Sequence, residues 1–191
     1  MCNVSLSRGT ARGIEYVGLP THLYAKRAIF LTGPIDDELA ECVVMQLLSL
    51  EGTDPATIVI NSPGGSVSAG LAIVDAMEAA PYPVRTHVLG RAASMAATIL
   101  ACGEPGHRTA APHADVLIHQ PLMYGQGGQA SDIAIAAAAV LKTRDQLNGL
   151  LAGKTGKSPE EIETATDRDN WMSAEEAVRF GIADRVAHLE L

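Results

Sequence analysis

Short apolar runs alternate with helical patterns along most of this 191-residue sequence. The runs at 28–32, 57–60, 84–89 and 115–119 are too short for helices, and each is followed by a Gly- or Pro-containing turn. Apolar runs of this length, bounded by turns, are typical of strands buried on both faces of a parallel sheet. The alternation therefore predicts an α/β fold with a mostly parallel sheet.

Helices are expected between and after these runs. Apolar spacing predicts them at 37–51, 67–80, 92–102 and 131–151. Capping boxes predict two more, beginning after Ser158 and Ser173, and Gly181 fits the end of the last one. No internal linker or repeat interrupts this pattern, so we expect a flexible N-terminal segment at 1–24 and a single domain at 25–191.

Composition excludes several classes of function. The net charge is −8 and no basic run occurs, which argues against a nucleic-acid surface. No apolar stretch reaches the roughly 18 residues of a membrane span, and the N-terminus lacks the apolar core of a signal peptide. The three cysteines have no CxxC spacing. We therefore expect a cytoplasmic protein that binds no membrane, nucleic acid, metal or cofactor, with a core of Ala, Val, Ile and Leu because aromatics are only 4%.

Ser94 and His119 stand where strands are expected to end. Ser94 follows a strand and a Gly90 turn and precedes a helix, so its hydroxyl would lie near N–H groups that favour negative charge. An ordinary N-cap is the simpler explanation of Ser94, taken alone. His119 lies at a strand end, where α/β proteins place their sites, but a core or loop histidine fits equally well.

Two further segments could complete a site. The turn at 61–66 contains Gly64 and Gly65, whose N–H groups could bind an oxyanion or a phosphate, or simply make a turn. Neither GxxxxGK[ST] nor GxGxxG is present, so a nucleotide loop is not predicted. The acidic segment 167–169 could orient a histidine or be a solvated loop. Among the other histidines, the sequence places one in a strand and one in a loop and predicts that the rest are solvated; they are His87, His113, His22, His107 and His188.

Taken together, six segments resemble the ClpP family, the proteolytic subunits of the ATP-dependent Clp protease. The resemblance runs from about residue 25 to 186, in order. The segments are IFLTG at 29–33, INSPGG at 60–65, GRAASMA at 90–96, IHQPL at 118–122, QASDI at 129–133 and DRDNWMSAEEA at 167–177.

This resemblance implies a ClpP/crotonase-type α/β fold with repeated β-β-α units and a projecting handle helix at about 131–151. It also implies roles for individual residues. Ser94 would be the nucleophile, His119 the general base and Asp169 the acid that orients it. The backbone N–H groups of Gly65 and Met95 would form the oxyanion hole. Extended substrate would bind along Leu122, Met123 and Tyr124, and Asp167, Arg168, Gln129 and Asp132 would be linked to oligomer contacts.

The implied function is a serine endopeptidase that degrades unfolded polypeptides to short peptides. Two heptameric rings would stack as a tetradecamer around a chamber, fed by a hexameric AAA+ Clp unfoldase. One alternative is a catalytically silent or partner-dependent ring subunit of a mixed Clp complex. A second is a crotonase-fold acyl-CoA enzyme, which the Ser–His–Asp set disfavours because such enzymes normally use glutamates.

Two regions depart from the family pattern. The segment before residue 25 differs from the usual axial-pore sequence. After His119, Met123 and Tyr124 stand where the family usually has glycines, and the loop is one residue longer. These departures predict a specialised paralogue that assembles with a second type of subunit.

Overall fold

The computed structural model describes residues 4–10, 13–123, 125 and 127–191. Its strands are β1 Ser5–Thr10, β2 Gly13–Gly18, β3 Ala28–Thr32, β4 Ala56–Ser62, β5 Val84–Ala93, β6 Arg108–Ala110, β7 Asp115–Ile118, β8 Asn170–Ser173 and β9 Arg185–Val186. Its helices are α1 Leu19–Ala25, α2 Asp37–Ser49, α3 Val67–Ala79, α4 Met95–Ala101, α5 Ala130–Thr155, α6 Pro159–Thr166 and α7 Ala174–Phe180.

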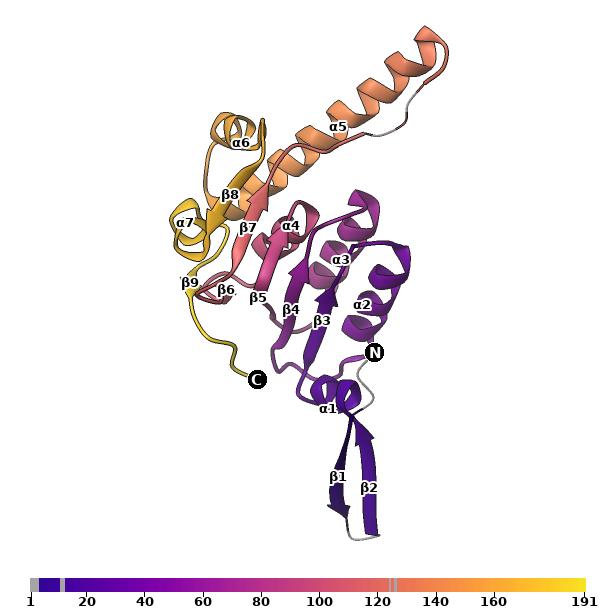
Figure 1. Ribbon diagram of the computed structural model, residues 1–191, viewed down its shortest axis with the longest axis vertical. Helices are drawn as coiled ribbons and strands as arrows, with labels where there is room; N and C mark the ends of the chain where they lie inside the picture. Colours follow the sequence, from indigo (N-terminus) through magenta and orange to yellow (C-terminus); the bar gives the residue numbers. More distant parts are fainter. Residues whose placement is uncertain (1–3, 11–12, 124, 126) are drawn as a thin grey trace.

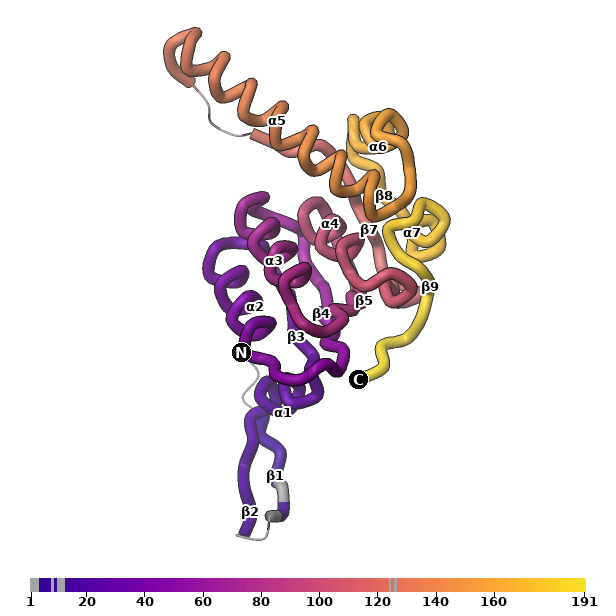
Figure 2. Tube along the Cα trace, turned by 180° about the vertical axis from the view of Figure 1, so that it is seen from behind, coloured from indigo at the N-terminus to yellow at the C-terminus, as the bar shows by residue number. Residues whose placement is uncertain are grey.

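A seven-stranded sheet runs in the order β3-β4-β5-β6-β9, with β7 beside the end of β5 and β8 beside β7. All its described pairs are parallel except β7–β8. Helices α2, α3 and α4 cover one face of this sheet (Figure 1). In Figure 2, the view from the opposite side, these helices lie in front of the strands. The predicted α/β class with a mostly parallel sheet is therefore confirmed.

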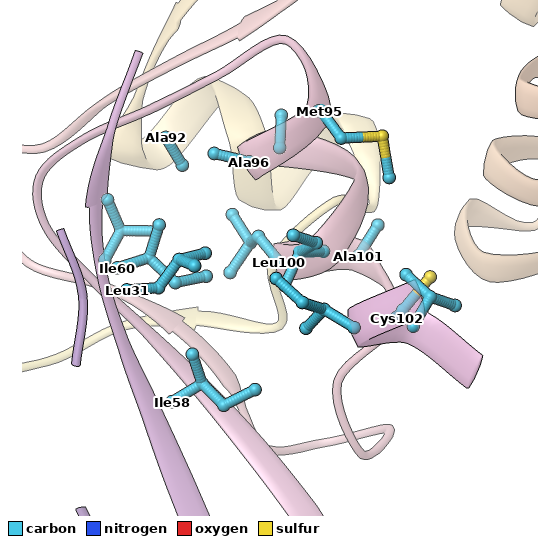
Figure 3. Close-up of a cluster of buried hydrophobic side chains, with 14 of the residues drawn as sticks. Leu31, Ile58, Ile60, Ala92, Met95, Ala96, Leu100, Ala101 and Cys102 are labelled. Carbon is cyan, nitrogen blue, oxygen red and sulfur yellow. The ribbon is translucent and has the colours of Figure 1, made fainter. Parts of the chain in front are cut away.

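The core is built from small aliphatic side chains, as the low aromatic content predicted. Leu31, Ile58 and Ile60 of the sheet are fully buried, and they point toward Ala96 and Leu100 of α4 (Figure 3). Every residue of α4 is buried. Because small side chains let α4 approach the sheet closely, the strand that precedes this helix is held firmly in place.

The N-terminal region, where the sequence predicts a flexible segment at 1–24, contains a hairpin and a helix that the sequence did not reveal. β1 and β2 pair as an antiparallel hairpin that projects from the domain, and α1 follows (Figure 1). Residues 13–16 of β2 are exposed, including Ile14 and Tyr16. Sequence periodicity arises from burial on one face, so a hairpin without a buried face carries no such signal.

Other differences lie at element ends. β5 continues through Gly90, which has a φ of 87°, and α4 begins only at Met95. Three short strands, β6, β8 and β9, were not predicted, whereas the equally short β7 was. Both capping boxes are confirmed, at Ser158 and Ser173, and Gly181 is left-handed as expected. Within the described part of the chain, every helix is too short or too polar to span a lipid bilayer.

A partly buried ion pair connects Arg108 of β6 to Asp184, the residue before β9. Arg108 donates to Asp184 from its backbone N–H and its guanidinium, with Nη2–Oδ1 at 2.5 Å and Nε–Oδ2 at 3.0 Å. Arg108 also donates to the carbonyls of Ala101 and Lys154, at the ends of α4 and α5. Burial raises the pKa of Asp184, but the hydrogen bonds from Arg108 outweigh it and leave that pKa below its usual value.

We predict that Asp184→Asn lowers the free energy of unfolding by roughly 2–4 kcal/mol, because it leaves the Arg108 charge buried and unpaired. Urea unfolding at pH 7 measures this. The folded-state pKa is depressed, so the stabilisation is present above about pH 4 and is lost as the pH falls through the folded value. The exposed Asp54→Asn is the control, and a similar loss for both variants would contradict the prediction.

Candidate active site

Ser94 occupies a one-residue turn between β5 and α4. Its φ of 57° and ψ of −124° are unusual for a residue with a side chain. Hydrogen bonds hold this conformation: the Ser94 N–H donates to the Leu117 carbonyl at 2.8 Å, and its carbonyl accepts from Ala97 at 2.9 Å. Such a sharp strand-to-helix turn presents the hydroxyl away from the helix.

The Ser94 hydroxyl makes no capping hydrogen bond to α4. Its Oγ lies 2.8 Å from Nε2 of His119 instead. The N-cap explanation therefore does not account for this serine. His119 directly follows β7, whose Leu117 is paired with Ala93 at the end of β5, so the two strand ends bring both side chains together.

Asp169 reaches His119 through the next strand pair. In the antiparallel β7–β8 ladder Ile118 stands opposite Asn170, so His119 and Asp169 come opposite each other. Asp169 Oδ1 lies 3.1 Å from His119 Nδ1, with the histidine side chain 14% exposed and the carboxylate 65% exposed. A hydroxyl, an imidazole and a carboxylate in hydrogen-bonded series can activate the hydroxyl as a nucleophile.

Gln120 supports this arrangement, and sequence reasoning missed it. Its N–H donates to the Thr166 carbonyl at 2.7 Å, and its Nε2 donates to the Asp167 carbonyl at 2.8 Å. The segment that carries His119 is thereby tied to the loop that carries Asp169. Only its position next to the histidine could have suggested this role.

The Gly64–Gly65 turn lies directly against Ser94. A Cβ on Gly64 would stand 2.5 Å from the Ala93 carbonyl oxygen and 2.7 Å from the Ser94 Cβ. A Cβ on Gly65 would stand 2.1 Å from the Ile35 carbonyl oxygen. Both glycines also have positive φ, so the close approach and the backbone conformation each require glycine here.

The N–H groups expected to form an oxyanion hole are open. Within the described ranges, neither the Gly65 N–H nor the Met95 N–H is engaged in a hydrogen bond. Met95 is the first residue of α4, where the helix leaves its N–H groups without internal acceptors. These two donors flank the serine turn and could stabilise a developing negative charge.

A small pocket of about 20 Å³ opens beside Ser94. Its walls are mostly apolar and come from α3, α4, β7 and the buried C-terminal half of α5. They are formed by Val67, Met95, Thr98, Ile118, Pro121, Leu147, Asn148 and Leu151, together with Ser94 and His119. An apolar side chain adjoining the reacting bond would fit this environment.

The remaining predicted site residues do not gather at Ser94. Leu122 and Met123 are exposed and belong to no strand, because the described chain provides no partner for them; Tyr124 lies outside the described residues. Gln129 and Asp132 begin the exposed start of α5. Asp167 and Arg168 are exposed, and Arg168 Nη1 donates to the Asp167 carbonyl at 2.8 Å.

A serine, a histidine and an aspartate joined in this way at the strand ends of an α/β sheet are typical of serine hydrolases. A model of the family described as Clp protease matches residues 12–190. The chain therefore belongs to the Clp protease family, as the sequence motifs predicted. Membership makes it a ClpP-type serine peptidase, in a family that generally forms oligomeric rings with Clp ATPases.

We predict that Gly64→Ala destabilises the fold by roughly 2–5 kcal/mol and reduces labelling of Ser94 by a fluorophosphonate, because the added methyl group meets backbone at a positive φ. Thermal unfolding and labelling rates measure these effects. Gly149→Ala is the matched control: it lies within α5, and its Cβ would meet nothing within 4 Å. We expect that variant to be as stable as wild type or slightly more so, and equal losses for both would contradict the assignment.

Proposed function

We propose that this chain is the proteolytic subunit of a self-compartmentalised protease, with Ser94, His119 and Asp169 as its catalytic residues. The observation that carries the proposal is the contact between Ser94 Oγ and His119 Nε2, at 2.8 Å, with Asp169 on the other imidazole nitrogen. This is the geometry that general-base activation of a serine requires.

In this mechanism Ser94 Oγ attacks the carbonyl carbon of a peptide bond while His119 Nε2 takes its proton. Asp169 holds Nδ1–H and stabilises the imidazolium. The N–H groups of Gly65 and Met95 bind the oxyanion. His119 then gives the proton to the leaving amine as the peptide C–N bond breaks, which leaves an acyl-serine ester. Water, activated by the same imidazole, releases the second product and restores the hydroxyl.

Substrate binding follows from the surfaces around the site. The apolar pocket beside Ser94 favours a small apolar side chain on the residue before the cleaved bond. Leu122 and Met123 follow His119 along the chain and, among the described residues, belong to no strand. We propose that they, with Tyr124, pair with extended substrate backbone, because an unpaired backbone offers main-chain donors and acceptors to an incoming strand.

The proposed assembly is a tetradecamer of two heptameric rings in the cytoplasm, fed with unfolded chains by a hexameric AAA+ Clp unfoldase. The projecting helix α5 exposes Ile133, Ile135 and Leu141, which favours burial against other subunits (Figure 1). Gln129, Asp132, Asp167 and Arg168 are exposed near this helix or near Asp169, consistent with oligomer contacts. Enclosure of the active sites in a chamber would prevent a nonspecific peptidase from cleaving the folded proteins of its own cell.

A partner-dependent subunit of a mixed ring, as the sequence departures suggest, is the alternative to a self-sufficient homomeric enzyme. It would share the Ser94–His119 geometry but react only beside a second type of subunit. An acyl-CoA enzyme has less support, since the described residues that line the Ser94 pocket include no glutamate.

We predict that Ser94→Ala lowers kcat/KM for a fluorogenic peptide by roughly 10⁴- to 10⁶-fold, because it removes the attacking oxygen. Native mass spectrometry should show the same assembly for the variant and wild type. A fluorophosphonate should label wild type alone. Normal cleavage by the variant would overturn the assignment, whereas labelling only after a second subunit is added would support the partner-dependent form.

We predict that Asp169→Asn lowers kcat by roughly 10³- to 10⁴-fold with little change in KM, because the amide favours the wrong imidazole tautomer. Steady-state kinetics measure both constants. Glu175→Gln, an equal loss of negative charge at an exposed position on α7, is the control. The same loss of kcat in both variants, with assembly intact, would argue against an orienting role specific to Asp169.

A further inference from the structure

A second hollow lies on the sheet face that α2, α3 and α4 leave uncovered. Its volume is about 320 Å³, and its charged and titratable walls are Arg85, His87, His107, Arg185, His188 and Glu190. It is separate from the Ser94 pocket, because His87 and Ser94 stand seven residues apart along β5, roughly 23 Å in an extended strand. The sequence placed His87 in a strand without a motif around it and predicted that His107 and His188 are solvated.

Strand pairing builds this site. His87 of β5 stands opposite Thr109 of β6, which stands opposite Arg185 of β9. The Thr86 hydroxyl donates to the Leu100 carbonyl of α4, so its neighbours Arg85 and His87 face away from the helices. The side chains of His87, Thr109 and Arg185 therefore form a row across this face of the sheet. Arg85 lies on the same face, two residues before His87 in β5.

The lining of the hollow is basic, although the protein as a whole is acidic. The chain carries a net charge of −8, yet this lining has two guanidinium groups and three imidazoles against one carboxylate. Among the described residues, neither Arg85 nor Arg185 forms an ion pair. Unpaired positive groups gathered in a concave surface attract anions.

His87 adds an unsatisfied group that points to a ligand. It is 2% exposed, and its Nδ1 lies 2.7 Å from Thr109 Oγ1. That hydroxyl donates to the Thr86 carbonyl, so Nδ1 carries the proton and Nε2 is left without a partner. Nε of Arg85 is likewise buried and unpaired. Such groups are costly, and a bound ligand that satisfies them would offset the cost.

We propose that this hollow binds an anion bearing several carboxylates, held by Arg85 and Arg185, with Nε2 of His87 donating in its protonated form. The positive groups are separated by about 7 Å along β5 and by about 10 Å across two strand spacings. Separated charges suit several carboxylates better than one compact phosphate. The ligand is either a small free polycarboxylate or a run of acidic side chains in a peptide, since both present the same chemistry.

Binding is coupled to proton uptake. Burial, and secondarily His188, lower the pKa of His87, so the imidazole is neutral in the empty hollow near pH 7. Arg85, Arg185, His107 and His188 face it and oppose its protonation, whereas Glu190 favours it. An added anion shifts the balance toward the protonated form, so the affinity rises as the pH falls.

Calorimetry with citrate and with a hexaglutamate peptide tests the proposal. The full chain is used in the assembly that it forms, in the Ser94→Ala background so that the peptide is not cleaved. We expect saturable binding of one citrate per chain, weakened at least tenfold by Arg85→Gln and by Arg185→Gln. Arg91→Gln, an equal loss of charge at an exposed position on the same strand, should leave the affinity unchanged.

The pH arm uses hexaglutamate, whose side chains stay ionised between pH 7 and pH 8. We expect at least threefold tighter binding at pH 7. His87→Asn keeps a donor toward Thr109 but removes Nε2, so it should remove most of this pH dependence; its melting temperature reports whether it folds.

The outcomes separate the two sources and can overturn the proposal. Citrate at least as tight as the peptide identifies a small free ligand, and a much tighter peptide identifies an acidic segment of a partner. No heat with either ligand at 10 mM, or unchanged affinity in both Arg85→Gln and Arg185→Gln, would refute the site. Tripolyphosphate binding tenfold tighter than citrate would refute the carboxylate assignment.

Discussion

The pairing of β7 with β5 on one side and with β8 on the other determines where the proposed catalytic residues lie. Ser94 follows the end of β5, His119 follows β7, and Asp169 precedes β8. The two ladders place Ala93 beside Leu117 and Ile118 opposite Asn170. The side chains of Ser94, His119 and Asp169 therefore meet through strand pairing alone. A register shift of one residue in either ladder would turn one member of the set to the opposite face.

Around these strand ends, backbone segments approach one another so closely that two positions, Gly64 and Gly65, have no room for a side chain. Gly64 lies against the turn that holds Ser94, and Gly65 lies against Ile35. The positive φ of Ser94 is maintained by its hydrogen bonds to Leu117 and to the first turn of α4. The buried, alanine-rich α4 lets these segments converge, because larger side chains would hold the helix away from the sheet.

Much of this could be predicted from the sequence. The strands at 28–32 and 57–60 and the helices that follow them are buried on one face or both, so their apolar patterns reveal them. The proposed triad residues could be named only by resemblance, because a serine before a helix is usually a cap and the segment 167–169 could as well be a solvated loop. The hairpin of β1 and β2, the role of Gln120 and the basic hollow around His87 were missed. Each depends on contacts between distant segments or on an exposed surface, which leave no local pattern.

Asp169 is the exposed member of the proposed catalytic set, and Ser94 is the member held most firmly by its surroundings. Ser94 is held by a close-packed helix and by backbone on two sides, whereas the carboxylate stands on a surface loop with more than half of its side chain in water. In the proposed ring, a subunit that packs over that loop would change the position of Asp169 before it could disturb Ser94. Neighbouring subunits could thus tune how fast the enzyme works without altering what it recognises.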